Sequence, residues 1–241
     1  MQKKKSLGQH FLHSASYLNA VADAADIQQG ETVLEVGPGE GTLTEVLLAR
    51  GAKVIAVEKD SRLISFLQNK FAGKNFEVTE GDALDFEISK YRNIDHYAVV
   101  GNIPYYISGA LFKKFLTTEH QPSALVFLVQ KEVAERIARS KKESILSLSV
   151  KAYGTPKYIK TVPAGAFSPP PKVDSAILLV SDISRGNFKN AAHEARFFAL
   201  IKKAFGQKRK MLRTTIGIDS SERPEDLPLA TWLDLSRVSV S

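Results

Sequence analysis

The sequence predicts an α/β fold in which helices cover both faces of a mostly parallel, doubly wound sheet, followed by a small helical domain. Short apolar segments alternate with helical segments as far as about residue 140. A glycine-rich turn at residues 37–41 follows the first apolar segment and precedes a helical one. After Gly186 the periodicity is helical. These three observations favour nucleotide-binding α/β architecture over an all-α or all-β fold.

The predicted elements follow in order along the chain. A helix begins after Ser14 and continues to Asp26, because apolar side chains there recur at helical spacing. Predicted strands cover Thr32–Val36, Lys53–Val57, Phe76–Glu80, Tyr97–Val100 and Ala124–Val129. Predicted helices cover Thr42–Arg50, Arg62–Lys70, Ser108–Leu116 and Lys131–Ser140. Helices that alternate with strands act as crossovers, so the strands are expected to be parallel.

The pattern changes in the last third of the chain. Three further strands are expected at Ile145–Ala152, Tyr158–Val162 and Val173–Val180. Strands this close together cannot have helical crossovers, so we expect antiparallel pairing at one sheet edge. An apolar stripe at helical spacing then predicts a helix formed around Ala195, Phe198, Ile201, Phe205 and Leu212. We place a domain boundary near residue 184, which gives a large α/β domain (1–184) and a small basic helical domain (185–241).

The composition favours a cytoplasmic protein with no metal site. No apolar run reaches the roughly 18 residues that a membrane span needs. The N-terminal residues carry charge but lack the apolar segment of a secretory signal. The sequence has no cysteine, which excludes disulfides and thiolate metal sites. Among the five histidines only His10 and His13 are close in sequence, and in a polar arm both are expected to be solvated.

The net charge of +7 is concentrated near the two ends of the chain. Lys3, Lys4 and Lys5 lie at the start, and residues 186–215 contain eight Lys or Arg against one Glu. Basic clusters of this kind favour a polyanionic partner. A solvated helix face is the alternative explanation of the same composition.

Three polar features at the ends of successive predicted strands indicate a nucleotide-type pocket. The turn Glu35–Gly41 (EVGPGEG) brings backbone amides close to a ligand. Glu58 ends the second strand, where a carboxylate can accept both ribose hydroxyls of an adenosine. Asp82 follows the third strand and can accept the amino group of an adenine. Thr42 occupies the position of the last glycine in a dinucleotide fingerprint, which disfavours NAD.

A fourth motif, Gly101–Tyr106 (GNIPYY), resembles that of amino-group methyltransferases acting on nucleobases, in which Asp, Asn or Ser precedes x-Pro-Tyr. Three more segments carry the same resemblance: Leu7–Leu12 (LGQHFL), Phe167–Ala176 (FSPPPKVDSA) and Ala204–Leu212 (AFGQKRKML). With the glycine turn, Glu58 and Asp82, they cover nearly the whole chain. The sequence therefore resembles the KsgA-type ribosomal RNA adenine dimethyltransferases, which are similar to the Erm enzymes.

The resemblance implies a Rossmann-like class I methyltransferase fold, with a mostly parallel sheet, an antiparallel edge strand and a small C-terminal helical domain. The implied cofactor is S-adenosyl-L-methionine. The implied substrate is two adjacent adenosines near the 3′ end of small-subunit (16S) rRNA, which become N6,N6-dimethyladenosine. A role in ribosome biogenesis follows, with the small ribosomal subunit as partner, no membrane association and a monomeric enzyme.

The resemblance also implies roles for single residues. The cofactor-binding positions are Gln9, His10, Leu12, Gly37, Gly39, Glu58, Lys59, Asp82, Ala83 and Asn102. The catalytic positions are Asn102, Pro104, Tyr105 and Phe167. Many relatives carry Asn where this chain has His10, so its backbone and its side chain are both candidate contacts. The alternative to a cofactor-binding arm is one that only packs Phe11 and Leu12 onto the domain.

The motif suggests how an adenine amino group could react. That nitrogen is a poor nucleophile because its lone pair is delocalised into the ring. Acceptors on both N–H bonds allow it to become more tetrahedral during attack, so no strong base is needed. The Asn102 side-chain oxygen and a carbonyl near Ile103–Pro104 are the expected acceptors, and Pro104 fixes the turn. Tyr105 and, by resemblance, Phe167 would enclose a base flipped out of its stack.

The basic segment has an implied partner as well. The positions expected to contact RNA phosphates are Lys202, Lys203, Lys208, Arg209, Lys210 and Arg213. Three alternatives stay open from sequence: an Erm-type methyltransferase of large-subunit (23S) rRNA, a non-catalytic ribosome assembly factor, and an NAD oxidoreductase. The triple-proline segment favours the small-subunit enzymes over the Erm type. The complete set of pocket residues argues against a non-catalytic scaffold.

Overall fold

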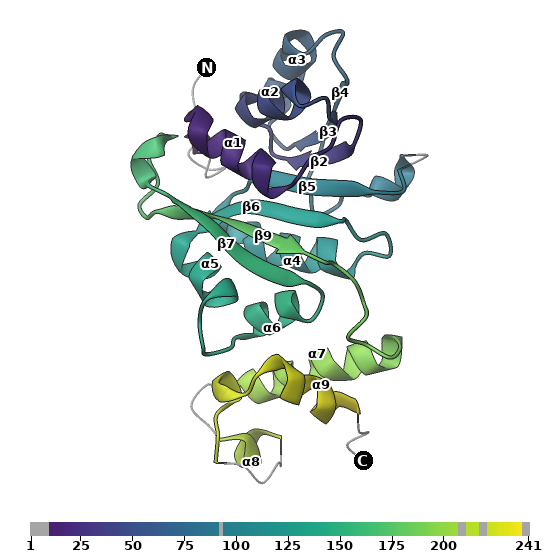
Figure 1. The fold of residues 1–241 in the computed structure, drawn as a ribbon, viewed down its shortest axis with the longest axis vertical. Helices are drawn as coiled ribbons and strands as arrows, with labels where there is room; N and C mark the ends of the chain where they lie inside the picture. Colours follow the sequence, from purple (N-terminus) through teal and green to yellow (C-terminus); the bar gives the residue numbers. More distant parts are fainter. Residues whose placement is uncertain (1–9, 92–93, 207–210, 217–220, 238–241) are drawn as a thin grey trace.

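A computed structural model describes residues 10–91, 94–206, 211–216 and 221–237 (Figure 1). Its centre is a seven-stranded sheet with the strand order β4-β3-β2-β5-β6-β9-β7. The strands are β2 (Thr32–Val36), β3 (Lys53–Glu58), β4 (Phe76–Glu80), β5 (Tyr97–Asn102), β6 (Ala124–Gln130), β7 (Thr155–Val162) and β9 (Ser175–Ser181). The first five are parallel, and β9 pairs antiparallel with both β6 and β7. The predicted parallel sheet with an antiparallel edge is therefore confirmed.

Helices cover both faces of the sheet. They are α1 (Ala15–Ala24), α2 (Thr42–Ala49), α3 (Ser61–Lys70), α4 (Ser108–Thr117), α5 (Lys131–Ala138) and α6 (Ile145–Lys151). Neighbouring strand residues contribute to different cores: Val33 packs with α1 and α2, whereas Leu34 packs in the cluster that includes α4 and α6. Buried strands between two helical layers explain the near-continuous apolar runs seen in the sequence.

The parallel register places the carboxyl ends of four strands at one edge of the sheet. Val36 at the end of β2 pairs with Gly101 of β5, and Glu58 at the end of β3 pairs with Glu80 of β4. Loops that leave these ends therefore converge. A second, two-stranded sheet pairs β1 (Phe11–Leu12) with β8 (Phe167–Ser168) and brings the N-terminal arm to the same region.

One predicted strand is wrong. Residues from Ile145 onward form helix α6 rather than a strand. Their alternation of apolar residues with serine matches a strand period, but Ser144 and Ser147 form a reciprocal capping box that fixes the helix start. Ser147, Leu148 and Val150 then form its buried face.

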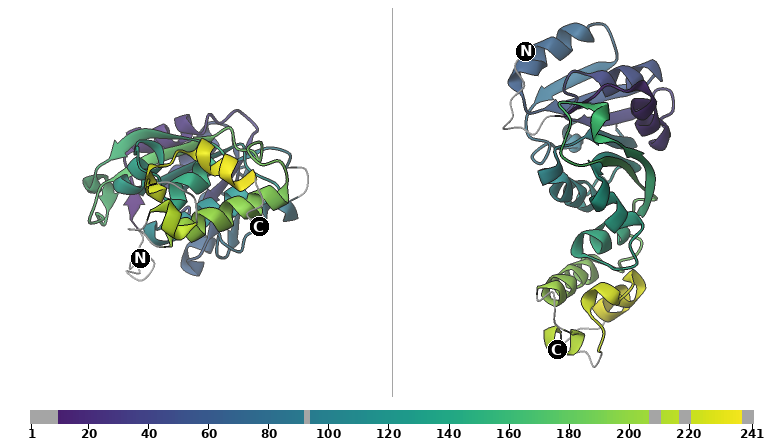
Figure 2. Two further views of the ribbon diagram at one scale, coloured as in Figure 1. Left: turned by 90° about the horizontal axis from the view of Figure 1, so that it is seen from below. Right: turned by 90° about the vertical axis from the view of Figure 1, so that its left-hand side faces the viewer.

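The C-terminal part is helical, with α7 (Ala191–Phe205), α8 (Leu212–Thr215) and α9 (Leu229–Arg237). Figures 1 and 2 show these helices at one end of the long axis, beyond α6, with α2 and α3 at the other end. The predicted stripe is shifted, because α7 buries Phe197, Ile201 and Ala204 while Ala195 is exposed. Helix α7 also ends at Phe205, so the stripe does not continue in one helix to Leu212.

The core of the C-terminal helices is continuous with the main core. Phe197 of α7 and Trp232 of α9 are fully buried in the same apolar cluster as residues of α4 and α6. His193 of α7 is also buried, and its ring bonds to Ser236 of α9 at 2.9 Å. The division into two domains near residue 184 stays a prediction. No helix in the described part of the chain is long and apolar enough to cross a membrane.

Candidate active site

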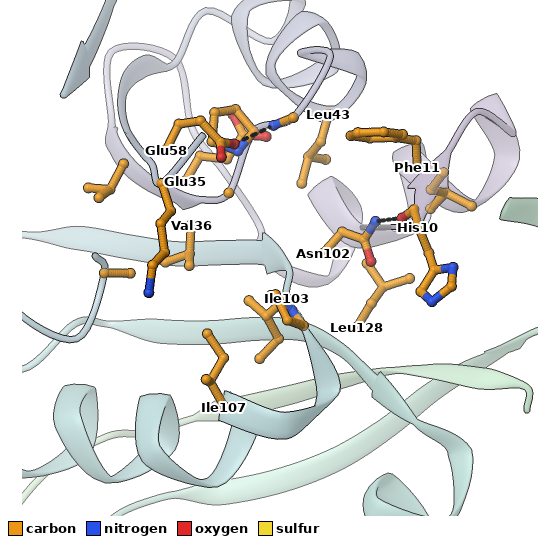
Figure 3. Close-up of a pocket in the computed structure, with 18 of the residues that line it drawn as sticks. His10, Phe11, Glu35, Val36, Leu43, Glu58, Asn102, Ile103, Ile107 and Leu128 are labelled. Carbon is orange, nitrogen blue, oxygen red and sulfur yellow. Dashed lines mark hydrogen bonds between the residues drawn. The ribbon is translucent and has the colours of Figure 1, made fainter. Parts of the chain in front are cut away.

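A pocket lies at the carboxyl ends of β2, β3, β4 and β5 and is closed on one side by the N-terminal arm (Figure 3). It brings together nearly all of the described residues that sequence motifs assigned to the cofactor and to catalysis. The predicted residues that line it are His10, Leu12, Gly37, Gly39, Glu58, Lys59, Asp82, Ala83, Asn102, Pro104 and Tyr105.

The glycine turn adopts backbone conformations that favour glycine. Gly37 and Gly39 have φ values of 67° and 59°. A Cβ on Gly39 would lie 2.6 Å from the ring of Phe11, so the missing side chain admits the arm. A Cβ on Gly37 would meet nothing within 4 Å. The turn thus accommodates the arm at Gly39 and leaves space at Gly37 for a ligand.

Glu58 is held in place by backbone amides. Its Oε2 accepts a hydrogen bond from Gly39 N at 3.1 Å, and its Oε1 accepts one from Asp60 N at 2.8 Å. Burial raises the pKa of this carboxyl, and the amide hydrogen bonds oppose that effect. Each carboxylate oxygen has a second lone pair, so both can still accept a hydroxyl. The two carboxylate oxygens are acceptors whose arrangement fits the two ribose hydroxyls of an adenosine.

Asp82 and Lys59, which line the pocket together with Glu58, form an ion pair. Lys59 Nζ lies 2.7 Å from Asp82 Oδ2, and Leu84 N donates to Asp82 Oδ1 at 2.9 Å. The hydrogen bond from Lys59 lowers the pKa of the Asp82 carboxyl. Asp82 is therefore an anionic acceptor, which is compatible with an adenine amino group as its partner.

Sequence reasoning missed a role for Glu35 as a buried acid. Its side chain lines the pocket, is only 1% exposed, and accepts a hydrogen bond from Thr44 Oγ1 at 2.6 Å. Burial raises its pKa from 4.5 to about 7; the Thr44 hydrogen bond lowers it and the nearby charge of Glu58 raises it further. A carboxylate inside the apolar strand TVLEV was the available signal. The Thr44 contact ties β2 to α2 across the glycine turn.

Asn102 is oriented by the N-terminal arm. Its Nδ2 donates to the backbone carbonyl of His10 at 2.6 Å (Figure 3). A carbonyl can only accept, so the amide NH2 must face the arm. The side-chain oxygen consequently keeps its lone pairs for another donor. This contact was not predicted from sequence.

Tyr105 is held from two sides. Its hydroxyl lies 2.6 Å from the hydroxyl of Ser175, a fully buried residue at the start of β9. Its ring stacks near that of His10, with a centroid distance of 6.2 Å and an interplanar angle of 21°. His10 Nδ1 donates to the carbonyl of Pro169 at 2.8 Å. Ser175 and Pro169 belong to the segment FSPPPKVDSA, which thereby supports the Asn-Ile-Pro-Tyr motif.

The remaining predicted positions lie elsewhere. Phe167 is only 5% exposed, is not among the residues that line the pocket, and pairs with Leu12 in the β1–β8 register. Lys202 and Lys203 are exposed in the last turn of α7, and Arg213 is exposed on α8. The predicted positions that fall outside the described residues are Gln9, Lys208, Arg209 and Lys210.

Known proteins with similar sequences and structures are ribosomal RNA adenine methyltransferases, in agreement with the geometry of this pocket. Residues 1–234 match the family described as ribosomal RNA adenine dimethylase. The chain is 40% identical to ribosomal RNA small subunit methyltransferase A of Dehalococcoides mccartyi, over 98% of this chain and 88% of that protein. A dimethyladenosine transferase structure from Plasmodium falciparum has a TM-score of 0.79 at 27% identity, covering 94% of this chain and 96% of that one.

The 23S rRNA methyltransferase ErmE has a similar fold. Its structure gives a TM-score of 0.77 at 25% identity, covering 94% of this chain and 98% of that one. The fold is therefore shared by both groups of methyltransferases. The family match and the nearly full-length relative, in contrast, both point to the adenine dimethylases. The chain belongs to the ribosomal RNA adenine dimethylase family.

Proposed function

We propose that this protein transfers methyl groups to N6 of two adjacent adenosines near the 3′ end of small-subunit rRNA. The observation that carries the proposal is the position of Asn102. Asn102 ends β5 and lines the pocket that also contains the acceptors Glu58 and Asp82. Its side-chain amide is oriented by a hydrogen bond to the His10 carbonyl. One side of the pocket suits an adenosine-containing cofactor, and the other presents an oriented acceptor to an amino group.

The methyl donor is S-adenosyl-L-methionine, which supplies an electrophilic methyl group on a sulfonium. Glu58 would hold the ribose hydroxyls and Asp82 the adenine amino group. The space beside Gly37 would admit the ligand close to the backbone. The remaining cofactor contacts are assigned to His10, Leu12, Gly39, Lys59, Ala83 and Asn102, which all line the pocket.

The target amino group is activated by alignment rather than by a strong base. The Asn102 oxygen accepts one N–H bond, and a backbone carbonyl near Ile103–Pro104 accepts the other. Tyr105 provides an aromatic surface for the flipped base, and its position is set by Ser175. Holding both reactants in this geometry removes much of the entropic barrier to transfer. Phe167 is assigned to the other face of the base by resemblance; its side chain is buried and does not line the pocket in this structure.

The exposed cations of the C-terminal helices are assigned to the RNA backbone. Lys202, Lys203 and Arg213 would contact phosphates, which gives attraction without sequence selectivity. We propose that the enzyme acts on ribosomal particles in the cytoplasm. The described residues that line the pocket come from one chain, which supports a monomeric enzyme. Nearly full-length similarity to ribosomal RNA small subunit methyltransferase A proteins of several bacteria, at 34–40% identity, favours the small subunit as substrate.

The direct test is methyl transfer from radiolabelled S-adenosylmethionine to undermethylated small subunits, large subunits and free rRNA. Nucleosides from each RNA are then separated by chromatography. We expect labelled N6,N6-dimethyladenosine in small-subunit RNA. Label confined to large-subunit RNA would show instead that the protein is an Erm-type methyltransferase. Tight subunit binding without label would make it an assembly factor.

A further inference from the structure

We propose that Tyr106 and Val173 form a stacking subsite for the nucleotide that neighbours the flipped adenosine. This inference rests on the proposed function, because it requires a polynucleotide substrate. A flipped adenosine stays joined to its neighbours through phosphodiesters, so at least one neighbouring base must lie at the mouth of the pocket. At that place the structure exposes the ring of Tyr106, which lines the pocket.

Five large hydrophobic side chains are exposed among the described residues: Phe66, Tyr106, Ile145, Val173 and Met211. Tyr106 is the most exposed of them, at 69%, and it is the member of this set that lines the pocket. Val173, at 44%, lies two residues before Ser175, whose hydroxyl contacts that of Tyr105. Tyr106 directly follows Tyr105 in the sequence, and Val173 lies two residues before Ser175, so two of the five are close in sequence to the pair that holds the target-base surface.

The local backbone explains why adjacent tyrosines have different environments. Tyr105–Ile107 form one turn of 3₁₀ helix, in which consecutive side chains point about 120° apart. Tyr105 is directed toward Ser175 and is partly buried, so Tyr106 is directed outward. One tyrosine thus borders the inside of the pocket and the next borders its mouth.

The chemistry of this rim suits a nucleobase better than a protein side chain. Proteins that bind single-stranded nucleic acid combine aromatic surfaces for bases with cations for phosphates. Lys172 is exposed beside Val173 in the sequence and supplies such a cation. An aromatic ring stacks on any base, so this subsite would add affinity and alignment rather than sequence selectivity.

The test compares Tyr106→Ala, Tyr106→Trp and Val173→Ala on undermethylated small subunits, measuring kcat and KM for the subunit. Phe66→Ala is the matched control, because it removes an exposed aromatic ring that does not line the pocket. We expect Tyr106→Ala to raise KM about tenfold, which corresponds to about 1.4 kcal/mol. Tyr106→Trp should restore KM to within twofold, Val173→Ala should raise it two- to threefold, and Phe66→Ala should leave it unchanged.

Rescue by tryptophan separates stacking from a structural role. An unchanged KM in Tyr106→Ala, or equal losses in Tyr106→Ala and Tyr106→Trp, would overturn the subsite. Failure of the wild-type protein to dimethylate small subunits in the same assay would instead overturn the proposed function. Near-ultraviolet circular dichroism of each variant checks that the fold is intact.

Discussion

The pocket and the C-terminal helices are stabilised by different kinds of interaction. In the pocket, polar groups have specific partners: two backbone amides hold Glu58, the His10 carbonyl holds Asn102, and Ser175 holds Tyr105. In the C-terminal part, buried apolar side chains such as Phe197 and Trp232 are the main contacts between α7 and α9, with a hydrogen bond between His193 and Ser236, while Lys202, Lys203 and Arg213 are exposed. Chemistry depends on orientation, whereas attraction of a phosphate backbone depends mainly on the number of charges.

The largest effect is expected at Asn102. Asn102→Ala removes the acceptor at the reacting nitrogen, so kcat should fall about 10²–10³-fold, as for other single groups that stabilise a transition state. Cofactor affinity, measured by calorimetry, should change much less. Methyl transfer at the wild-type rate would refute the role of this side chain.

Asn102→Asp provides a sharper variant of the same test. A carboxylate keeps the acceptor but cannot donate to the His10 carbonyl, so the arm contact is lost. We expect kcat to fall at least tenfold even though the motif tolerates Asp in other enzymes. Full activity would show that the arm does not orient this residue.

The second effect concerns stability. The pKa of Glu35 is raised from 4.5 to about 7, so the folded state binds a proton more tightly than the unfolded chain. Its contribution to stability is therefore greatest at low pH and declines as the pH rises from 4.5 through about 7, by about 3 kcal/mol in total. Glu35→Gln should remove this decline, as measured by urea unfolding at pH 5 and pH 8. Glu119→Gln, the same change at an exposed site, should not; equal behaviour of the two variants would contradict the assignment.

The third effect tests the C-terminal helices. Neutralising Lys202, Lys203 and Arg213 together should raise KM for small subunits about tenfold and leave kcat within twofold. The slope of log affinity against log salt should become shallower by about 2–3, because roughly 0.7–0.9 counterions are released per phosphate contact. An unchanged salt slope would identify these residues as an ordinary solvated helix face. Lys208, Arg209 and Lys210 belong to the same prediction but lie outside the described residues.

The smallest effect is expected at the hydroxyl pair of Tyr105 and Ser175. Removing a hydrogen bond of this kind costs about 1 kcal/mol, so Ser175→Ala and Tyr105→Phe should each lower kcat about fivefold. The double variant should be no worse than either single variant, because both remove the same contact. Tyr97→Phe is the control, since its hydroxyl bonds to the His120 carbonyl at the other end of β5. Additive losses in the double variant would show that the pair does not act together.

Much of the fold could be predicted because its strands are short apolar runs bounded by turn residues. The predicted range Thr32–Val36 agrees with β2 at both ends. The segment at Ile145 was mistaken for a strand because its alternation is compatible with either structure, and the capping box decided the outcome. The stripe in α7 was shifted because the buried face is set by packing against α9, which sequence periodicity does not reveal.

The composition of the site could be predicted, but its internal contacts could not. Motifs located Glu58, Asp82 and Asn102, since each lies at or just after the carboxyl end of a strand, and these ends meet at the same side of the sheet. The contacts of Asn102 with His10 and of Tyr105 with Ser175 join residues 92 and 70 positions apart. Such pairings depend on the β1–β8 sheet and on the start of β9, which local patterns do not specify.

The most direct test of the contrast between the two regions is a single-turnover measurement of methyl transfer, with enzyme in saturating excess over undermethylated small subunits. Wild type, Asn102→Ala and the triple variant of Lys202, Lys203 and Arg213 would be compared with cofactor in excess. We predict that Asn102→Ala loses about 10²–10³-fold in rate at saturation, whereas the triple variant recovers to within twofold of wild type. A saturated rate that is lost in the triple variant but kept in Asn102→Ala would contradict the account.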